Sequence, residues 1–277
     1  MSLAQPRLIA TDLDGTIVPF DASISSRTVN AIVGALEKGA IVYFVTGRPP
    51  RWLGDITDAF GPLGVPITIC GNGALVFDVT NNCTLFENFL QPEVALEVVK
   101  RLRAHIVDAA FACEFGDEFR REVNYHARWD LNMDPDGVEA IEKVIDRPCI
   151  KLLARCTSGS LSSDAMLEIA MAEIADLVEV THSNPEDSLL EISALGVNKG
   201  STLARMAASH GLNAADCIAF GDQPNDVSML NWAGRSWAMG SAHRDAKLAA
   251  NFIAADCNDD GVAAVLEELF DLDRRDD

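Results

Sequence analysis

Two aspartates separated by one residue, Asp12 and Asp14, follow a short apolar run and lead into the turn Gly15–Thr16. Alternate residues of an extended segment point to the same side, so both carboxylates can converge on one ligand just beyond a strand. Such a pair serves either a divalent cation that prefers oxygen ligands or a nucleophile with a neighbouring acid. A calcium-like turn or a loop that enters a helix would also explain this D-x-D-G-T sequence.

Three further polar clusters carry side chains suited to the same chemistry. Thr46–Arg48, with the sequence T-G-R, offers a hydroxyl and backbone N–H groups that can hold phosphate oxygens. Asn198–Gly200 (N-K-G) places a lysine at the start of a predicted helix, and Gly221–Asp226 (G-D-Q-P-N-D) gathers acidic and amide oxygens behind an apolar run. Taken singly, the first two are also compatible with an ordinary turn and a solvated surface lysine. A helix cap would explain one residue of the third cluster, but not all of them.

The apolar runs around these clusters predict an α/β fold. Residues 7–11 and 40–45 are expected to form buried strands, and residues 26–38 between them have the apolar spacing of a helix. Further elements are expected near the C-terminus: strands at 217–220, 236–239 and 252–254, and helices at 199–210, 226–232, 245–250 and 262–269. Strand–helix–strand units build a parallel sheet with helices on both faces, and ligands bind at the carboxyl edge of such sheets. The four clusters would therefore meet at one edge.

The intervening segment, residues 83–189, has a different pattern. Helices are expected there at 93–105, 137–144 and 164–174, and strands at 110–115, 150–155 and 177–181. We interpret these elements as a separate α+β domain inserted into the first. The first domain would then be discontinuous and consist of residues 1–82 and 190–277.

The chain of 277 residues is strongly acidic, with 42 acidic against 22 basic residues and a formal net charge of −20. A nucleic-acid-binding protein would be expected to carry a basic face, so we expect neither DNA nor RNA as a partner. The negative charge also repels anionic metabolites. A phosphate ester would therefore need a metal ion and a few local cations in its site.

The apolar runs are too short for a membrane span of roughly 20 residues, and residues 1–7 lack the pattern of a secretory signal. We therefore expect a soluble, cytoplasmic protein without a membrane partner. The cysteines form no C-x-x-C pair and the histidines no H-E-x-x-H pattern. This usage favours free thiols in a reducing compartment and argues against a zinc site.

The order D-x-D-G-T, T-G-R, N-K-G and G-D-x-x-N-D resembles the four-motif signature of the haloacid dehalogenase superfamily. The long interval between Thr46 and Lys199 leaves room for a cap domain, and this placement is similar to the type IIB, Cof-like branch of sugar-phosphate and related phosphatases. Further matches to this branch are Gly71–Ala74, Ala238–Gly240 and Asp260–Val262. The resemblance implies a Rossmann-like core with a parallel sheet and an inserted α+β cap of type IIB. Where relatives often have Met-Gly-Asn-Ala, this chain has serine at Ser241, so no side-chain role is carried over to that position.

The resemblance also implies roles for individual residues. Asp12 would attack phosphorus and form an aspartyl-phosphate, and Asp14 would protonate the leaving alkoxide and then activate water. The phosphoryl group would be held by Thr46, Gly47, Lys199 and Asn225. Mg²⁺ would be bound by Asp12, the backbone carbonyl of Asp14, Asp222 and Asp226.

The substrate would be a small phosphorylated metabolite, and we expect the inserted domain to contribute to its recognition. The candidate contact residues are Arg48, Asn72, Arg120, Arg121 and Arg128, although each arginine of the inserted domain, taken singly, also suits a solvated surface position. We therefore expect a magnesium-dependent phosphatase of sugar phosphates or of phosphorylated cofactors and intermediates. A phosphotransferase or phosphomutase would use the same motifs, and a non-catalytic metabolite-binding protein is a third alternative. The sequence leaves the oligomeric state open.

Overall fold

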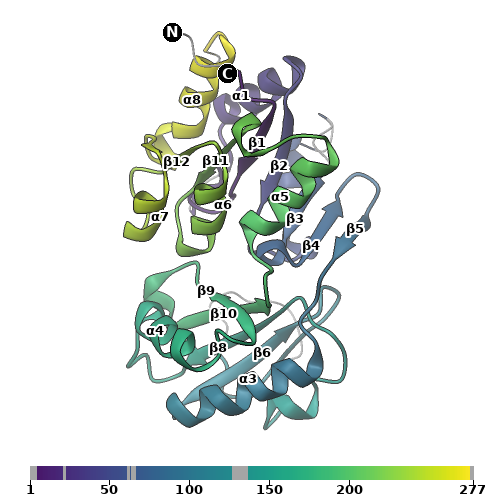
Figure 1. The fold of residues 1–277 in the computed structure, drawn as a ribbon, viewed down its shortest axis with the longest axis vertical. Coiled ribbons are helices and arrows are strands. Elements are labelled where there is room, and N and C mark those ends of the chain that lie inside the picture. Colours follow the sequence, from purple (N-terminus) through teal and green to yellow (C-terminus); the bar gives the residue numbers. More distant parts are fainter. Residues whose placement is uncertain (1–4, 21–22, 61–62, 64–66, 127–136, 275–277) are drawn as a thin grey trace. The chain divides into compact units, whose positions relative to one another are not determined.

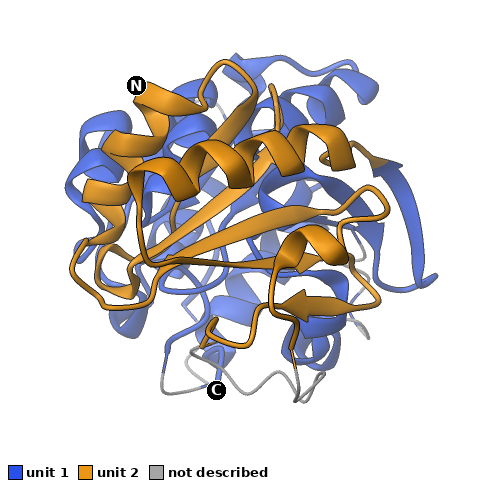
Figure 2. Ribbon diagram, turned by 90° about the horizontal axis from the view of Figure 1, so that it is seen from below, with its two compact units in different colours: residues 1–86, 198–277 blue, residues 87–197 orange. Residues whose placement is uncertain are grey.

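The computed structural model describes residues 5–20, 23–60, 63, 67–126 and 137–274, and Figure 1 shows its fold. The chain forms two compact units, which Figure 2 distinguishes by colour. Unit 1 comprises residues 1–86 and 198–277, and unit 2 comprises residues 87–197. Unit 1 is thus built from both ends of the chain, and unit 2 from its middle.

Unit 1 is built on an eight-stranded sheet with the strand order β13-β12-β11-β1-β2-β3-β4-β5. The strands are β1 (Leu8–Thr11), β2 (Ile41–Val45), β3 (Ile67–Cys70), β4 (Leu75–Asp78), β5 (Cys83–Glu87), β11 (Cys217–Gly221), β12 (Arg235–Ala238) and β13 (Phe252–Ile253). The helices are α1 (Ser26–Glu37), α2 (Gly54–Phe60), α5 (Lys199–Ser209), α6 (Val227–Trp232), α7 (Arg244–Ala249) and α8 (Gly261–Phe270). Neighbouring strands from β13 to β3 run parallel, whereas β4 is antiparallel to β3. The predicted α/β fold with a parallel core sheet is confirmed, and the antiparallel strand is an addition to it.

The central strand β1 is short, and every residue in it is buried. It lies between β11 and β2, with Thr11 level with Phe220 on one side and Phe44 on the other. Parallel neighbours end at the same edge of a sheet. The loops that follow β1, β2 and β11 therefore leave the sheet side by side, and they carry the first, second and fourth polar clusters.

Side-chain caps fix where two helices of unit 1 begin. The Ser25 hydroxyl accepts a hydrogen bond from the Thr28 N–H at 3.0 Å and starts α1. At α5, the Asn198 side chain accepts from the Ser201 N–H at 2.8 Å, and the Ser201 hydroxyl accepts from the Asn198 N–H at 3.1 Å. Such caps contribute about 1 kcal/mol each. The reciprocal cap at α5 places Lys199 as the first residue of that helix.

Unit 2 contains a five-stranded antiparallel sheet with the order β7-β6-β8-β10-β9. Its strands are β6 (Ala109–Glu114), β7 (Phe119–Arg121), β8 (Lys151–Cys156), β9 (Val178–Thr181) and β10 (Leu189–Ala194), and its helices are α3 (Pro92–His105) and α4 (Ser163–Glu173). Apolar side chains of both helices, such as Val98 and Met166, form one buried cluster with Phe111, Leu152 and Ile192 of the sheet. Unit 2 therefore has a hydrophobic core of its own.

The helix predicted at residues 137–144 is wrong. Ile141–Lys143 form only a short 3-10 turn, preceded by extended backbone at Ala140. The Val138 N–H donates instead to the carbonyl of Arg121 at 2.9 Å, and the buried Glu122 carboxylate accepts the Ile141 N–H at 2.8 Å. Hydrogen bonds to a distant segment thus override the local apolar spacing.

The helices that the structure describes are short compared with a membrane span. α3 has 14 residues, whereas a span needs about 20. Within the described ranges, no helix combines the length and the apolar character needed to cross a bilayer.

Candidate active site

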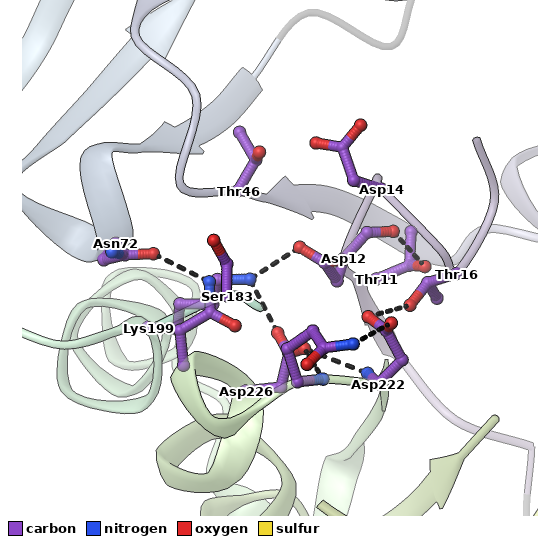
Figure 3. Close-up of polar contacts among 12 residues, drawn as sticks. Thr11, Asp12, Asp14, Thr16, Thr46, Asn72, Ser183, Lys199, Asp222 and Asp226 are labelled. Carbon is purple, nitrogen blue, oxygen red and sulfur yellow. Dashed lines mark hydrogen bonds and ion pairs between the residues drawn. The ribbon is translucent and has the colours of Figure 1, made fainter. Parts of the chain in front are cut away.

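The four polar clusters meet in unit 1, where the loops after the central strands lie beside the start of α5 (Figure 3). Asp12 directly follows β1, and its N–H donates to the Phe220 carbonyl in β11 at 3.0 Å. Asp222 directly follows β11. Oxygen atoms of Asp12, Asp222 and Asp226 lie within 4.8 Å of one another, and all three side chains are buried. These three residues, called the acidic cluster below, come from opposite ends of the chain.

Lys199 is the cation of this cluster. Its Nζ atom lies 2.5 Å from Oδ1 of Asp12 and 2.6 Å from Oδ1 of Asp226, and its side chain is completely buried. The position of α5 depends on Gly200, because a Cβ there would lie 2.3 Å from the Ser228 carbonyl oxygen at the start of α6. The close approach of the two helices therefore holds Lys199 against both carboxylates.

Asp226 organises the loop that follows β11. Its Oδ2 accepts hydrogen bonds from the backbone N–H groups of Asp222 and Gln223, each at 2.9 Å. Its Oδ1 is the atom bound by Lys199. Both oxygens of this predicted metal ligand thus have hydrogen-bond partners within the protein. Asp226 is a member of the acidic cluster, and it also holds the backbone of Asp222 and the side chain of Lys199 in position.

The turn after Asp14 brings an aromatic ring to the rim of the acidic cluster. Gly15 has φ +81°, and a Cβ on it would lie 2.5 Å from Oδ2 of Asp222 and 3.4 Å from Cε2 of Phe20. An L-residue would meet both the strain of a left-handed conformation and a clash with Asp222. Phe20 itself is 73% exposed. Phe20 was not among the residues selected from the sequence.

The charges of the site do not balance within the protein. Burial raises the pKa of Asp12 well above its usual value, and the Asp226 carboxylate adds to the rise although Lys199 opposes it. Burial, and then the Asp226 carboxylate, also raise the pKa of Asp222 to about 7. Burial alone would lower the pKa of Lys199, but Asp12 and Asp226 outweigh burial and raise it. Three buried carboxylates therefore share one ammonium group.

This imbalance fits a divalent cation. Mg²⁺ prefers carboxylate and other oxygen ligands, and it would compensate the charge of the Asp226 carboxylate, which adds to burial in raising the pKa values of Asp12 and Asp222. Asn225 supplies a second sign of a missing partner, because its Oδ1 is buried without a hydrogen-bond partner in the part of the chain that the structure describes. The predicted ligands Asp12, Asp222 and Asp226 are suited to such an ion, whereas the Asp14 side chain is not part of the acidic cluster.

The predicted phosphate-binding residues lie in the same loops. Thr46 follows β2, is buried, and its hydroxyl accepts the Arg48 N–H at 3.1 Å across the turn that contains Gly47. The Asn72 N–H donates to the Thr46 carbonyl at 3.0 Å, and Asn225 Nδ2 donates to Asn72 Oδ1 at 3.1 Å. Asn72, predicted as a substrate contact, therefore joins the loops after β2 and β11.

Arg48, also predicted as a substrate contact, lies between two carboxylates. Its Nε donates to Oδ2 of Asp14 at 2.8 Å, and its Nη2 donates to Oδ1 of the same residue at 2.5 Å. Its Nη1 contacts both oxygens of Asp55 at 2.9 Å and donates to the Trp52 carbonyl at 3.1 Å. No motif pointed to Asp55, and no helix was expected at residues 54–60; in the structure Asp55 lies in the first turn of α2, where acidic residues are common.

The predicted arginines of the inserted domain have separate contacts. Arg120 pairs with Glu118 at 2.7 Å and lies over the Phe115 ring, with 5.7 Å between the guanidinium carbon and the ring centroid. Arg121 donates to backbone carbonyls, including that of Tyr125 at 3.3 Å. Arg128 lies outside the described residues. The contacts of Arg120 and Arg121 described here are all within unit 2, so a role in substrate binding stays a prediction.

Comparison with known proteins finds similarity over most of this chain. The family model for haloacid dehalogenase-like hydrolases matches residues 9–266. A 5-amino-6-(5-phospho-D-ribitylamino)uracil phosphatase of Bacillus subtilis is 27% identical to this chain, with 94% of each chain covered. A pyridoxal phosphate phosphatase of Escherichia coli is 25% identical, with 93% of this chain and 96% of the other covered.

Solved structures share the fold over most of the chain. A protein from Streptococcus mutans UA159 superposes with a TM-score of 0.81 at 21% identity, covering 96% of this chain and 100% of that one. The subclass IIB sugar phosphatase BT4131 superposes with a TM-score of 0.77 at 20% identity, covering 94% of this chain and 98% of that one. At these identities the similarity is one of fold.

Proposed function

Since this chain belongs to the haloacid dehalogenase-like hydrolase family, we propose that it is a magnesium-dependent phosphatase that hydrolyses phosphate monoesters of small metabolites through an aspartyl-phosphate. The observation that carries the proposal is the contact of Lys199 with Asp12 inside the acidic cluster. A carboxylate held by a buried ammonium group beside two further carboxylates suits phosphoryl transfer. In that reaction a negatively charged nucleophile must approach phosphorus, and the negative charge of the transition state must be compensated by cations.

Asp12 is the proposed nucleophile. Lys199 holds Oδ1 of this carboxylate, which orients the other oxygen for attack on phosphorus. The new bond to Asp12 forms as the bond from phosphorus to the ester oxygen breaks, so one difficult displacement is divided into two easier ones. Lys199 and Thr46 are the proposed partners of the phosphoryl oxygens, and burial strengthens their electrostatic contribution.

Asp14 is the proposed acid and base. It would give a proton to the departing ester oxygen and later take one from the water that cleaves the aspartyl-phosphate. Its side chain is 42% exposed, so it is accessible to water and to an ester, unlike the buried acidic cluster.

Mg²⁺ would be held by the Asp12 carboxylate, the Asp14 backbone carbonyl and Asp222, with Asp226 behind them. When bound, the ion supplies positive charge that offsets the repulsion between a carboxylate and a phosphate dianion. Within the protein, Thr16 and Gln223 orient Asp222: the Thr16 hydroxyl donates to Oδ1 at 3.4 Å and the Gln223 Nε2 to Oδ2 at 3.0 Å.

The substrate class is proposed from the relatives and from one side chain. The two phosphatases compared above act, by name, on phosphate esters that carry a nitrogen heterocycle. The exposed Phe20 ring at the rim of the acidic cluster would suit a substrate with such a ring, because aromatic faces stack on one another. Phosphorylated cofactors and their intermediates are therefore the first compounds to test, and sugar phosphates the second.

A phosphate-release screen tests the proposal. The panel contains heterocyclic phosphates, sugar phosphates, polyol phosphates and nucleotides, each with Mg²⁺ and with a chelator, and no other phosphoryl acceptor is added. We expect magnesium-dependent release of inorganic phosphate by the wild type. Asp12→Asn should reduce it to background, because no other carboxylate in the acidic cluster can replace the nucleophile. Release that persists in Asp12→Asn, or no release of inorganic phosphate from any ester without an added acceptor, would contradict the proposal.

A further inference from the structure

Arg48 connects Asp14 to a carboxylate that has no assigned role. One edge of its guanidinium group, Nε and Nη2, faces both oxygens of Asp14. The remaining nitrogen, Nη1, faces both oxygens of Asp55 and the carbonyl of Trp52. The Arg48 side chain is only 16% exposed, whereas Asp14 and Asp55 are 42% and 43% exposed. A largely buried cation thus lies between two accessible anions.

The contact with Arg48 occupies the group that the reaction needs. Both oxygens of the Asp14 carboxylate accept hydrogen bonds from Arg48, so each is engaged by a donor other than an ester oxygen or water. Bidentate pairs of this kind have a strict geometry and are among the stronger hydrogen-bonded pairs. To give or take a proton at a substrate, Asp14 must turn at least one oxygen out of this pair.

Asp55 is held more firmly than Asp14. Its Oδ1 also accepts the Ile56 N–H at 2.9 Å in the first turn of α2. Buried Leu53, Ile56 and Phe60 fix this helix and the turn before it in the core of unit 1. Asp55 therefore provides Arg48 with a fixed partner on the side opposite to Asp14.

We propose that Asp55 is a positioning residue for the phosphatase reaction. Asp55 keeps the Arg48 guanidinium in place when Asp14 turns toward the substrate. The contact between Asp14 and Arg48 then breaks, and Arg48 does not move with Asp14. A cation with two carboxylate partners retains one when the other departs, whereas a cation with a single partner would be left uncompensated. The inference rests on the proposed function, because it takes Asp14 as the acid and base.

The choice of leaving group makes the inference testable. An aryl phosphate such as p-nitrophenyl phosphate releases a stable phenolate without help from an acid, whereas an alkyl phosphate releases an alkoxide that needs a proton. The value of kcat/KM reports the steps up to formation of the aspartyl-phosphate, while kcat also includes its hydrolysis, in which Asp14 takes a proton from water.

For Asp55→Asn we expect kcat/KM for the alkyl ester to fall about tenfold, because part of the general-acid contribution is lost, and kcat/KM for the aryl ester to stay within about twofold. The kcat for the aryl ester should fall, and its KM with it. Asp55→Glu should recover part of the loss because it restores a carboxylate. Asp58→Asn removes the same charge from an exposed position of α2 and should behave as the wild type.

Asp14→Asn gives the reference for complete loss of the acid. It should lower the alkyl-to-aryl ratio of kcat/KM further than Asp55→Asn does, and adding Asp55→Asn to it should change the ratio no further. Equal losses on both esters, an unchanged ratio in Asp55→Asn, or additive effects in the double variant would each overturn the positioning role. A wild type that releases no phosphate from any ester would instead overturn the proposed function, and an unchanged ratio in Asp14→Asn would overturn the role of Asp14 and this inference together.

Discussion

The Nζ atom of Lys199 lies 2.5 Å from Oδ1 of Asp12, although 187 positions separate the two residues in the sequence. Both side chains are buried, and the same ammonium group binds Asp226 at 2.6 Å. A buried ion pair is costly to form, but removal of one partner costs more, because it leaves the other charge without compensation. This contact therefore ties the stability of unit 1 to the residues proposed for catalysis.

Lys199→Met should lower kcat/KM by about a hundredfold or more, since loss of one group that stabilises developing charge has effects of this size. The variant should also unfold more easily, by about 3 kcal/mol, because Asp12 and Asp226 remain buried without their cation. Phosphate-release kinetics and urea unfolding measure the two effects. Lys38→Met, an exposed position just after α1, is the matched control. Activity within tenfold of the wild type would contradict the role given to Lys199.

The metal-free protein should lose stability as the pH rises through about 7, where Asp222 loses its proton. The pKa of Asp222 is higher in the folded protein than in the unfolded chain. Its contribution to the free energy of unfolding is therefore complete at low pH and is lost as the pH rises through the pKa of the folded protein. Mg²⁺ should reverse this trend, since it binds the deprotonated acidic cluster.

Thermal unfolding between about pH 5 and about pH 8, with and without Mg²⁺, measures this linkage. Asp222→Asn should make the metal-free profile less steep, with the raised pKa of Asp12 accounting for the slope that remains. Proton release into a weakly buffered solution should accompany addition of Mg²⁺ to the wild type near pH 7. A metal-free unfolding temperature that rises over this interval would count against the charge imbalance described above.

Gly200→Ala should separate α5 from α6. The added Cβ would lie 2.3 Å from the Ser228 carbonyl oxygen, and neither backbone can yield without moving its helix. Overpacking of this kind costs about 1–3 kcal/mol, and the displaced Lys199 should lower activity as well. Gly54→Ala is the control, since a Cβ there meets no atom within 4 Å and φ is not in the left-handed region. Urea unfolding and phosphate release are measured for both variants. A loss in Gly200→Ala alone indicates crowding between α5 and α6, whereas an equal loss in both variants indicates a general effect of alanine.

Phe20→Ala should raise KM for phosphate esters that carry an aromatic ring by about tenfold, the equivalent of one aromatic contact, and leave KM for sugar phosphates unchanged. Leu248→Ala provides a control with similar exposure, 72% against 73%, on α7. Steady-state kinetics on one substrate of each class give the comparison. The same change in KM for both classes would show that Phe20 affects the conformation of its own loop and does not contact the aromatic ring of the substrate.

Much of unit 1 could be predicted because its signals are local. Apolar runs at 7–11, 40–45 and 217–220 became β1, β2 and β11 with shifts of a residue or so, and the polar residues behind them fell at one edge of the sheet. In unit 2, residues 137–144 carried an apolar spacing that a buried carboxylate, Glu122, overrode. A local sequence pattern does not predict a hydrogen bond to a segment that is distant in the sequence.

The partners of Arg48 could not be predicted for a similar reason. The T-G-R sequence indicated a cation near a phosphate, but its two carboxylates depend on how the 3-10 turn at Pro50–Trp52 and α2 fold back toward the loop after β1. Asp226 is a comparable case, because its bonds to two backbone N–H groups follow from the tight turn after β11 and not from its residue type.

The strand order also determines when the site can exist during synthesis. β1 is synthesised before unit 2, but its neighbour β11 is added only after unit 2 has been made in full. Unit 2 is continuous and has its own hydrophobic core, so it can fold before β11 has been made and has paired with β1. A nascent chain that stops at Val197 would contain Asp12 and a complete unit 2, yet neither Lys199 nor Asp222. Activity should thus arise only after the residues that follow unit 2 have been made and have joined unit 1.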